Sequence, residues 1–213
     1  MTAFGGIEHK HDNGNDFEQN YKHPGLIEFK LEDLYTSGSP IFTLNAGLIS
    51  KSVFNHIKFD ERIPMYYEDI LVILKIFMNY PSTYLLRETV YCYYCNPDSI
   101  THIQADSSSF SLRFICAIRF YVEITLESAK KSKKVAKAFA NKCFNTYCAY
   151  IINFHNNKWE IGKNIYSLVR TEISKIIRYT SFSRKLIFIF VKRNLALVYL
   201  IKILKFLRVY LCF

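Results

Sequence analysis

The spacing of hydrophobic and polar residues divides the chain into two parts. The run 69–80 is dense in Ile, Leu, Val and Phe, which predicts a helix buried on most sides, ended by Pro81. The segment 83–95 is rich in β-branched and aromatic residues and predicts a strand or a tight strand pair. From about residue 107 the pattern is helical throughout. The expected order is therefore mixed α/β followed by helices alone.

The pattern also predicts the finer elements of each part. Before residue 60 we expect a strand end followed by a polar loop, a short strand or helix over 26–38, and a short helix within 40–57 that Ser50 or Ser52 caps. Two or three strands with one helix cannot cover both faces of a sheet, so an uncovered apolar face is expected. The later helices are expected at 107–129, 132–157, 159–179 and 184–211.

Charge separates the same two parts. Residues 1–110 hold 8 Lys+Arg and 14 Asp+Glu, a balance of −6, whereas residues 111–213 hold 20 and 4, a balance of +16. We therefore predict two functional pieces, residues 1–106 and residues 107–213. A basic part rich in aromatic residues suits an anionic lipid or a nucleic acid.

The cysteines indicate a reducing compartment. The six cysteines form no disulfide framework, and residues 1–14 contain no apolar signal segment, so a cytosolic location is expected. Cys92 and Cys95 have the spacing of a metal-binding pair, but no second pair follows, which makes structural zinc a weak interpretation.

The most informative feature is a pair of adjacent carboxylates, Glu68 and Asp69, at the start of the helix predicted from residue 69. Acidic residues are common at helix starts, where they cap or face the positive end of the helix dipole. The alternative is that one of them is a catalytic base. The residues around the pair bear on this choice.

The segment "NAGLISKSVFNHIKFDERIPMYYEDILVILKIFMNYPSTYLLRETVYCYYCNPDSITH" (45–102) resembles the second half of the catalytic domain of family 2 glycosyltransferases. The parts match in order: a small-residue segment, "F-D-E-x-I", the Glu-Asp pair opening an apolar helix, an aromatic strand region and "S-I-T". The resemblance is strongest to bacterial enzymes that build lipopolysaccharide or capsule polysaccharide. It implies a GT-A (Rossmann-like) α/β catalytic domain, of which residues 1–106 would be the C-terminal part.

The resemblance also implies roles for particular residues. In such inverting enzymes the second acid, here Asp69, is the general base that removes a proton from the acceptor hydroxyl, and Glu68 belongs to the acceptor site. His102 would contact the diphosphate or the metal ion, or it is an ordinary loop histidine. Ser99 and Thr101 would bind the donor, or they are turn residues. A nucleotide-sugar donor and a glycan or lipid-linked acceptor are the implied partners.

The chain departs from the family pattern at the metal site. The family uses a divalent cation, Mn²⁺ or Mg²⁺, held by an Asp-x-Asp motif, and no such triplet occurs in this sequence. We therefore expect a truncated transferase that lacks the nucleotide-binding half and is inactive alone, or one whose other half is carried by a separate chain. The alternative is a non-catalytic helical scaffold protein of the membrane surface with a small α/β cap.

The basic segment from Arg184 onward is too often interrupted by charges to span a bilayer, since its longest charge-free run is 194–201. Its spacing is that of amphipathic pieces that lie on an anionic membrane, so a peripheral position at the inner face of the membrane is expected. The segment 129–137, "AKKSKKVAK", has no interleaved aromatic residues, and no nucleic-acid partner is expected.

Overall fold

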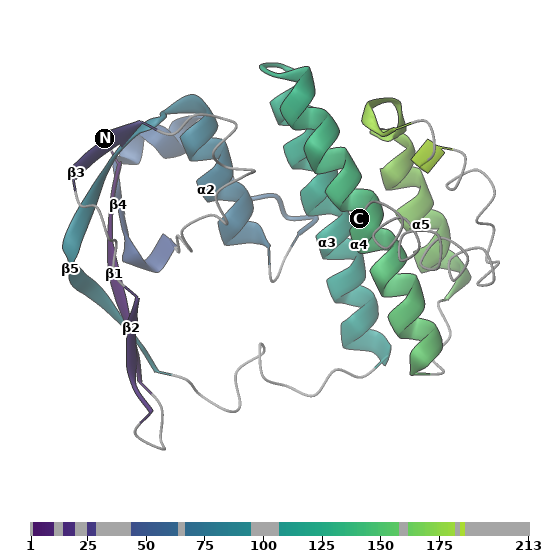
Figure 1. Ribbon diagram of the computed structural model, residues 1–213, viewed down its shortest axis with the longest axis horizontal. Helices are drawn as coiled ribbons and strands as arrows, with labels where there is room; N and C mark the ends of the chain where they lie inside the picture. Colours follow the sequence, from purple (N-terminus) through teal and green to yellow (C-terminus); the bar gives the residue numbers. More distant parts are fainter. Residues whose placement is uncertain are drawn as a thin grey trace, which may run out of the picture.

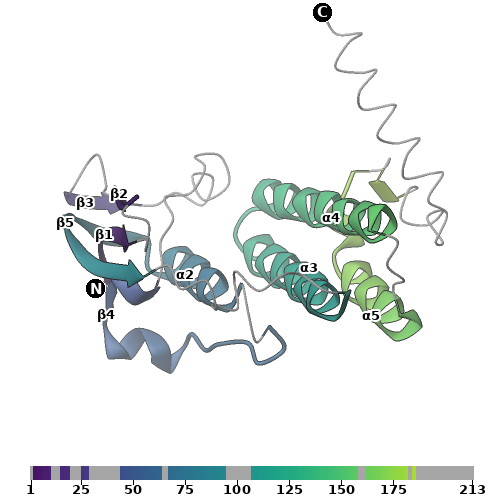
Figure 2. The same cartoon turned by 90° about the horizontal axis from the view of Figure 1, so that it is seen from below.

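The computed structural model describes residues 2–10, 15–19, 25–28, 44–63, 67–94, 107–157, 162–181 and 184–185. The fold is mixed α/β, with a five-stranded sheet and helices packed to one side of it. Figures 1 and 2 show the order in space: the sheet, then α2 (Glu68–Asn79), then a pair of long helices, and α5 (Lys163–Ser174) farthest from the sheet.

The sheet is built around two parallel strands, β1 (Thr2–Lys10) and β5 (Ser82–Tyr94). Three short strands complete it: β2 (Phe17–Gln19) and β4 (Gly47–Ile49) pair antiparallel with β1, and β3 (Gly25–Glu28) pairs antiparallel with β5. The expectation of two or three strands was therefore wrong. β3 lies at the start of the short strand or helix predicted over 26–38. β2 and β4 fall where no strand was expected, because three residues are too few to show an alternating pattern.

One face of the sheet is covered by α2. Leu85 and Phe4 are neighbours across β5 and β1, and both are buried on this face. The Phe4 ring lies 5.6 Å from the ring of Phe77 in α2. The ring also lies against Gly47, where an added Cβ would meet Phe4 Cε1 at 2.7 Å. Glycine at this position therefore leaves room for the aromatic ring that joins the sheet to the helix.

The opposite face of the sheet carries an exposed apolar row. Leu26, Tyr84, Ala3 and Leu48 are successive cross-strand neighbours from β3 to β4, so their side chains share one face. Leu26, Tyr84 and Leu48 are 70%, 47% and 78% exposed. No helix among the described residues lies on this face in Figures 1 and 2. The predicted uncovered face is therefore present in the described part of the chain.

The short helix expected within 40–57 is a 3₁₀ helix, and a second 3₁₀ helix precedes it. These are η1 (Leu44–Ala46) and η2 (Lys51–Asn55). Ser50 occupies the predicted N-cap position, but its hydroxyl makes no cap hydrogen bond and lies 2.9 Å from the Ser52 hydroxyl. The position of the cap was predicted, but not the type of helix or the bond.

The helices of the second part agree with the sequence pattern where the structure describes them. α3 spans Ser107–Ala129 and α4 spans Lys133–Asn156, within one residue of the expected bounds. α5 starts later than expected, after Gly162, and the chain continues as a 3₁₀ turn, η3 (Ile177–Tyr179). Of the segment expected at 184–211, only Arg184 and Lys185 are described, and they are helical.

A single hydrophobic cluster crosses from the α/β part into the helices. Phe4, Ile63 and Leu71 pack in the same cluster as Phe120 of α3 and Phe139 of α4. A second cluster fills the space among α3, α4 and α5. α3 is thus the helix through which the two parts pack, while the division of the chain at residue 106 stays a prediction.

Candidate functional site

The candidate site is the acid pair, Glu68 and Asp69, in the first turn of α2. Tyr67 is the N-cap residue, and its backbone oxygen accepts the first helical bond from Leu71 at 2.9 Å. The cap position carries no side-chain hydrogen bond, and neither carboxylate has a hydrogen bond or ion pair with another described residue. Because the acids do not bond the helix N–H groups, the described contacts do not support the capping interpretation.

The two carboxylates are partly withdrawn from water. Burial raises the pKa of Asp69, and the nearby Glu68 charge raises that pKa further. The Oε2 atom of Glu68 is buried and has no hydrogen-bond partner among the described residues. The positive end of the helix dipole favours an ionised carboxylate, but burial and the Glu68 charge act on Asp69 in the opposite direction. A carboxylate in this state accepts a proton more readily than an exposed one.

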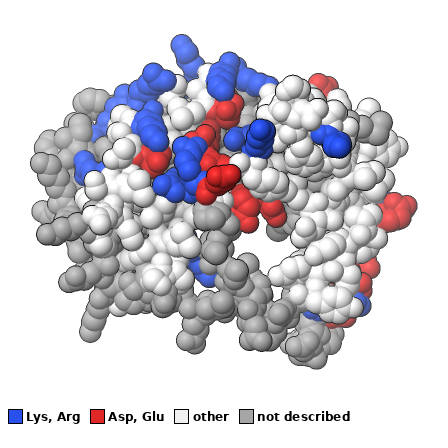
Figure 3. Space-filling model, turned by 180° about the vertical axis from the view of Figure 1, so that it is seen from behind, with Lys and Arg blue, Asp and Glu red and all other residues white. Residues whose placement is uncertain are grey.

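Figure 3 shows one face of the molecule, on which acidic side chains gather near the middle while basic side chains lie mainly above them. Charges of opposite sign therefore lie close together on this face.

Aromatic contacts fix the start of α2. The ring of Tyr67 stacks on Phe120 of α3, with centroids 5.2 Å apart. Its hydroxyl is hydrogen-bonded to Tyr150 of α4, and burial raises the pKa of Tyr67. Ile63, four residues earlier, is fully buried in the cluster shared with α3. The acid pair therefore follows a residue that is anchored in the helical part.

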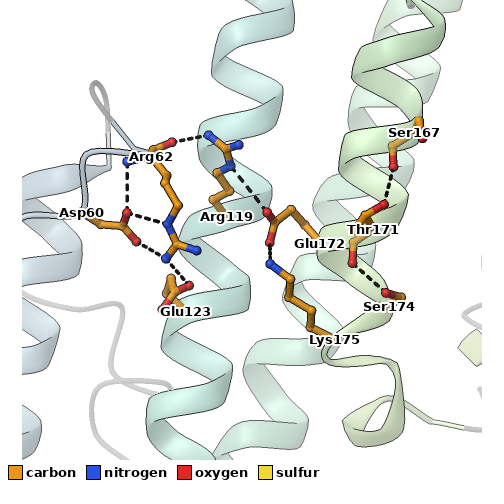
Figure 4. Close-up of polar contacts among 9 residues, drawn as sticks. All are labelled: Asp60, Arg62, Arg119, Glu123, Ser167, Thr171, Glu172, Ser174 and Lys175. Carbon is orange, nitrogen blue, oxygen red and sulfur yellow. Dashed lines mark hydrogen bonds and ion pairs between the residues drawn. The ribbon is translucent and has the colours of Figure 1, made fainter.

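Charged residues hold the loop before the acid pair against the helices (Figure 4). Arg62 bonds Asp60 Oδ1 through Nε at 2.8 Å and Asp60 Oδ2 through Nη2 at 2.6 Å. The same Nη2 lies 2.6 Å from Glu123 Oε1 of α3. The Arg62 guanidinium holds the pKa of Asp60 below its ordinary range, and the carboxylates raise the pKa of Arg62.

The network continues through α3 to α5. Arg119 Nη1 donates to the backbone oxygen of Arg62 at 2.6 Å. Its Nε lies 3.7 Å from Glu172 Oε1, and Lys175 Nζ lies 2.5 Å from Glu172 Oε2. Figure 4 shows these side chains pointing toward one another from the loop, α3 and α5. The "F-D-E-x-I" segment thus has a structural role, since Asp60 binds Arg62 and Ile63 is core.

The other predicted site residues are not brought to the acid pair by the described structure. His102, Ser99 and Thr101 lie outside the described residues, as does Cys95. Cys92 is a free thiol in β5. His9 stacks on Phe17 at 4.3 Å and meets Tyr93 edge-on at 5.6 Å, so it belongs to an aromatic row of the sheet.

A divalent cation finds no complete set of ligands in the described residues. No group of three or more His, Cys, Asp or Glu side chains is arranged to hold a metal ion there. Glu68 and Asp69 supply two carboxylates, and the sequence has no Asp-x-Asp triplet to complete the family's cation site. The described residues therefore do not fit the cation that the resemblance implies, and no step is assigned to it.

Sequence reasoning missed the residues that support the acid pair. Tyr67, Arg62, Arg119, Glu123 and Glu172 act through contacts between segments far apart in the chain. The only local signal was the spacing of Asp60 and Arg62. Oppositely charged residues two positions apart are common in loops, so this spacing does not predict an ion pair.

No protein-family model, no curated protein and no solved structure matches this chain significantly. Within the described residues, no helix is both long enough and apolar enough to cross a membrane.

Proposed function

We propose that this chain supplies the acceptor-side part of an inverting, nucleotide-sugar-dependent glycosyltransferase of the GT-A type, in cell-surface polysaccharide synthesis. Asp69 is the general base and Glu68 belongs to the acceptor site. The observation that carries the proposal is the state of Asp69: it sits in the first turn of α2 without a basic partner among the described residues, and burial and Glu68 raise its pKa.

In the proposed reaction the acceptor hydroxyl oxygen bonds to the anomeric carbon of the donor sugar. The bond from that carbon to the diphosphate oxygen breaks, and the nucleoside diphosphate leaves with the electron pair. The hydroxyl proton passes to Asp69, whose carboxylate becomes neutral. Glu68 keeps this proton transfer favourable, because a second negative charge nearby stabilises the protonated form of Asp69.

In the family that the chain resembles, the donor half of the reaction uses an Asp-x-Asp cation site, and this sequence contains no such triplet. Stabilising the leaving diphosphate usually takes a cation or several basic groups. We propose that the nucleotide-binding half is contributed by further polypeptide, either in a longer product or in a separate chain. The exposed row Leu26, Tyr84 and Leu48 supports this proposal, since a second layer on that face would remove it from water.

The experiment compares two forms of the protein. The 213-residue chain, supplied with Mn²⁺ or Mg²⁺ and a panel of nucleotide sugars, is expected to release no nucleoside diphosphate. The longer product or complex, isolated from source cells through antibodies to the C-terminal part, is expected to release it. Turnover by the 213-residue chain alone would contradict the need for a second half.

Asp69→Asn in the active form tests the base directly. It is expected to lower kcat about 10²–10⁴-fold, the usual contribution of a general base. Glu61→Gln is the matched control, because Glu61 is an exposed acid in the loop before α2. Equal activity of the two variants would exclude Asp69 as the base. Absence of nucleoside diphosphate release from both the 213-residue chain and the longer product or complex would instead favour the alternative function, a non-catalytic helical scaffold, which the extensive basic helical part supports.

A further inference from the structure

The structure brings two basic segments, far apart in the sequence, to one end of the helical part. The first is the turn between α3 and α4 with the first turns of α4, and the second follows α5. We call this surface the basic end and define it by nine residues: Lys130, Lys131, Lys133, Lys134, Lys137, Lys175, Arg178, Arg184 and Lys185.

Contacts between α4 and the chain after α5 hold the two segments together. The backbone N of Ser181 lies 3.5 Å from Asn141 Oδ1 of α4. Asn141 is four residues from Lys137 and seven from Lys134, so the three share one face of α4. Arg184 Nη1 donates to the Ser181 hydroxyl at 3.1 Å. In Figure 1 the α3–α4 turn and η3 lie at the same end of the helices.

The basic end has an excess of positive charge that the described acids do not neutralise. α4 contains no acid. Glu123 and Glu127 of α3 and Glu172 of α5 are already paired with Arg62, Lys130 and Lys175. Lys133, Lys134 and Lys137 are exposed and make no ion pair with a described residue. Figure 3 shows basic side chains spread along this edge of the molecule.

The position of these lysines is unfavourable in the isolated protein. α4 has no acidic residue in its first turn, and Lys133, Lys134 and Lys137 surround its N-terminus, where the helix dipole is positive. Cations are normally favoured at the other end of a helix. An anionic partner would relieve both the repulsion among the lysines and their repulsion by the dipole.

The chemistry around the basic end favours a lipid surface over a nucleic acid. In the stretch 130–137 only lysine and serine side chains reach the solvent. The stretch contains no aromatic residue on which nucleic-acid bases could stack. The chain leaves the basic end at Lys185 into the sequence "LIFIFVKRNLALVYLIKILKFLRVYLCF", in which large apolar residues are interrupted by single cations. That composition suits the interface of an anionic bilayer.

We propose that the basic end is a docking surface for an anionic phospholipid bilayer, with Lys133, Lys134 and Lys137 as its main contacts. The proposal goes beyond sugar transfer and does not depend on it. It assigns lipid binding to the turn between α3 and α4 and to the first turns of α4, and it orients α4 with its N-terminus toward the headgroups.

The test is co-sedimentation of the full chain with vesicles of phosphatidylcholine containing phosphatidylserine, and with vesicles of phosphatidylcholine alone. The variant is Lys133→Gln/Lys134→Gln/Lys137→Gln. The matched control is Lys51→Gln/Lys58→Gln/Arg87→Gln, which removes three exposed cations of the α/β part. Circular dichroism checks that both variants keep the helical content of the wild type.

Each basic residue near an anionic surface strengthens binding to that surface about fivefold. Removal of three should therefore make the variant bind the anionic vesicles about a hundredfold more weakly at low ionic strength. The control should stay close to the wild type, and the difference should shrink as salt is added. Equal binding by the variant and the control would overturn the proposal, as would equal binding of the wild type to both kinds of vesicle.

Two further experiments test whether the basic end binds a different anion instead of a lipid surface. Millimolar inorganic phosphate at constant ionic strength should leave vesicle binding unchanged, and displacement would assign the surface to a small anion instead. A single-stranded RNA oligonucleotide should bind no more tightly than the vesicles do. If the variant lost RNA binding and kept vesicle binding, the surface would belong to a nucleic acid and the lipid proposal would be wrong.

Discussion

Arg119 of α3 donates a 2.6 Å hydrogen bond to the backbone oxygen of Arg62, in the loop that leads to the acid pair. The same guanidinium lies 3.7 Å from Glu172 of α5. One side chain thus connects the α/β part, α3 and α5. Because the acceptor in the loop is a backbone atom, the identity of the residue at position 62 carries no signal for this contact.

Replacing Arg119 by Met should lower the free energy of unfolding by about 1–3 kcal/mol. The Glu172 side chain is only 8% exposed, and the change leaves it with Lys175 as its ion-pair partner among the described residues. Urea denaturation measures the effect. Arg87→Met, at an exposed position of β5, is the control and should change the value by less than about 0.5 kcal/mol. Equal losses would show that the contact is not stabilising.

The stability of Asp69→Asn separates a functional acid from a helix cap. Loss of a cap costs about 1 kcal/mol. A raised pKa in the folded state has the opposite consequence, because folding then disfavours the charged carboxylate at neutral pH. We expect the variant to be more stable than the wild type at pH 7, by less than about 1 kcal/mol because the side chain is partly exposed.

Thermal or urea unfolding at two pH values checks this sign. The gain should be complete at neutral pH, should shrink as pH falls through the raised pKa, and should vanish only below about pH 4, the ordinary carboxyl range, where Asp69 is protonated in both states. Loss of stability in Asp69→Asn at pH 7 would restore the capping interpretation.

Asp60 should show the reverse pH dependence. Its folded-state pKa is lowered by Arg62, so its contribution to stability is complete above about pH 4, the ordinary carboxyl range, and is lost as pH falls through the lowered pKa. Asp60→Asn should therefore be less stable than the wild type at pH 6 to 7, by about 1 kcal/mol, and the two should converge in acid. A constant difference across this range would assign the loss to packing instead of charge.

Gly47→Ala tests the contact that joins the sheet to α2. The new Cβ would meet the Phe4 ring at 2.7 Å, and Phe4 is fully buried against Phe77. We expect a loss of about 1–3 kcal/mol from overpacking. Phe4→Leu should cost less in the Gly47→Ala background than in the wild type, because the smaller side chain makes room for the methyl group. Additive losses would show that the two residues do not interact.

The extent of successful prediction follows from the length and periodicity of each element. α2, α3, α4 and β5 are long enough for their apolar spacing to fix their bounds within about a residue. β2 and β4 are three residues long and could not be recognised, and β3 was anticipated only as a short strand or helix over 26–38. The acid pair was found because two carboxylates precede an apolar run.

The surroundings of the acid pair could not be predicted in the same way. Tyr67 stacks on Phe120, which is 53 positions later in the chain, and no local pattern distinguishes Phe120 from other apolar residues of α3. The raised pKa of Asp69 likewise depends on burial by residues that only the folded chain brings near. Both features belong to tertiary packing, which overrides what a short segment encodes.

The cluster that runs from Phe4 and Leu71 to Phe120 and Phe139 has a practical consequence for work with fragments. If the polypeptide were cut in the segment between β5 and α3, the residues of this one cluster would be divided between two molecules. Each piece expressed by itself would present an apolar surface and tend to aggregate. Expressed together, the pieces carry matching surfaces, so α3 should allow them to reassemble by complementation. The chain is therefore suited to split-protein experiments and poorly suited to domain-by-domain purification.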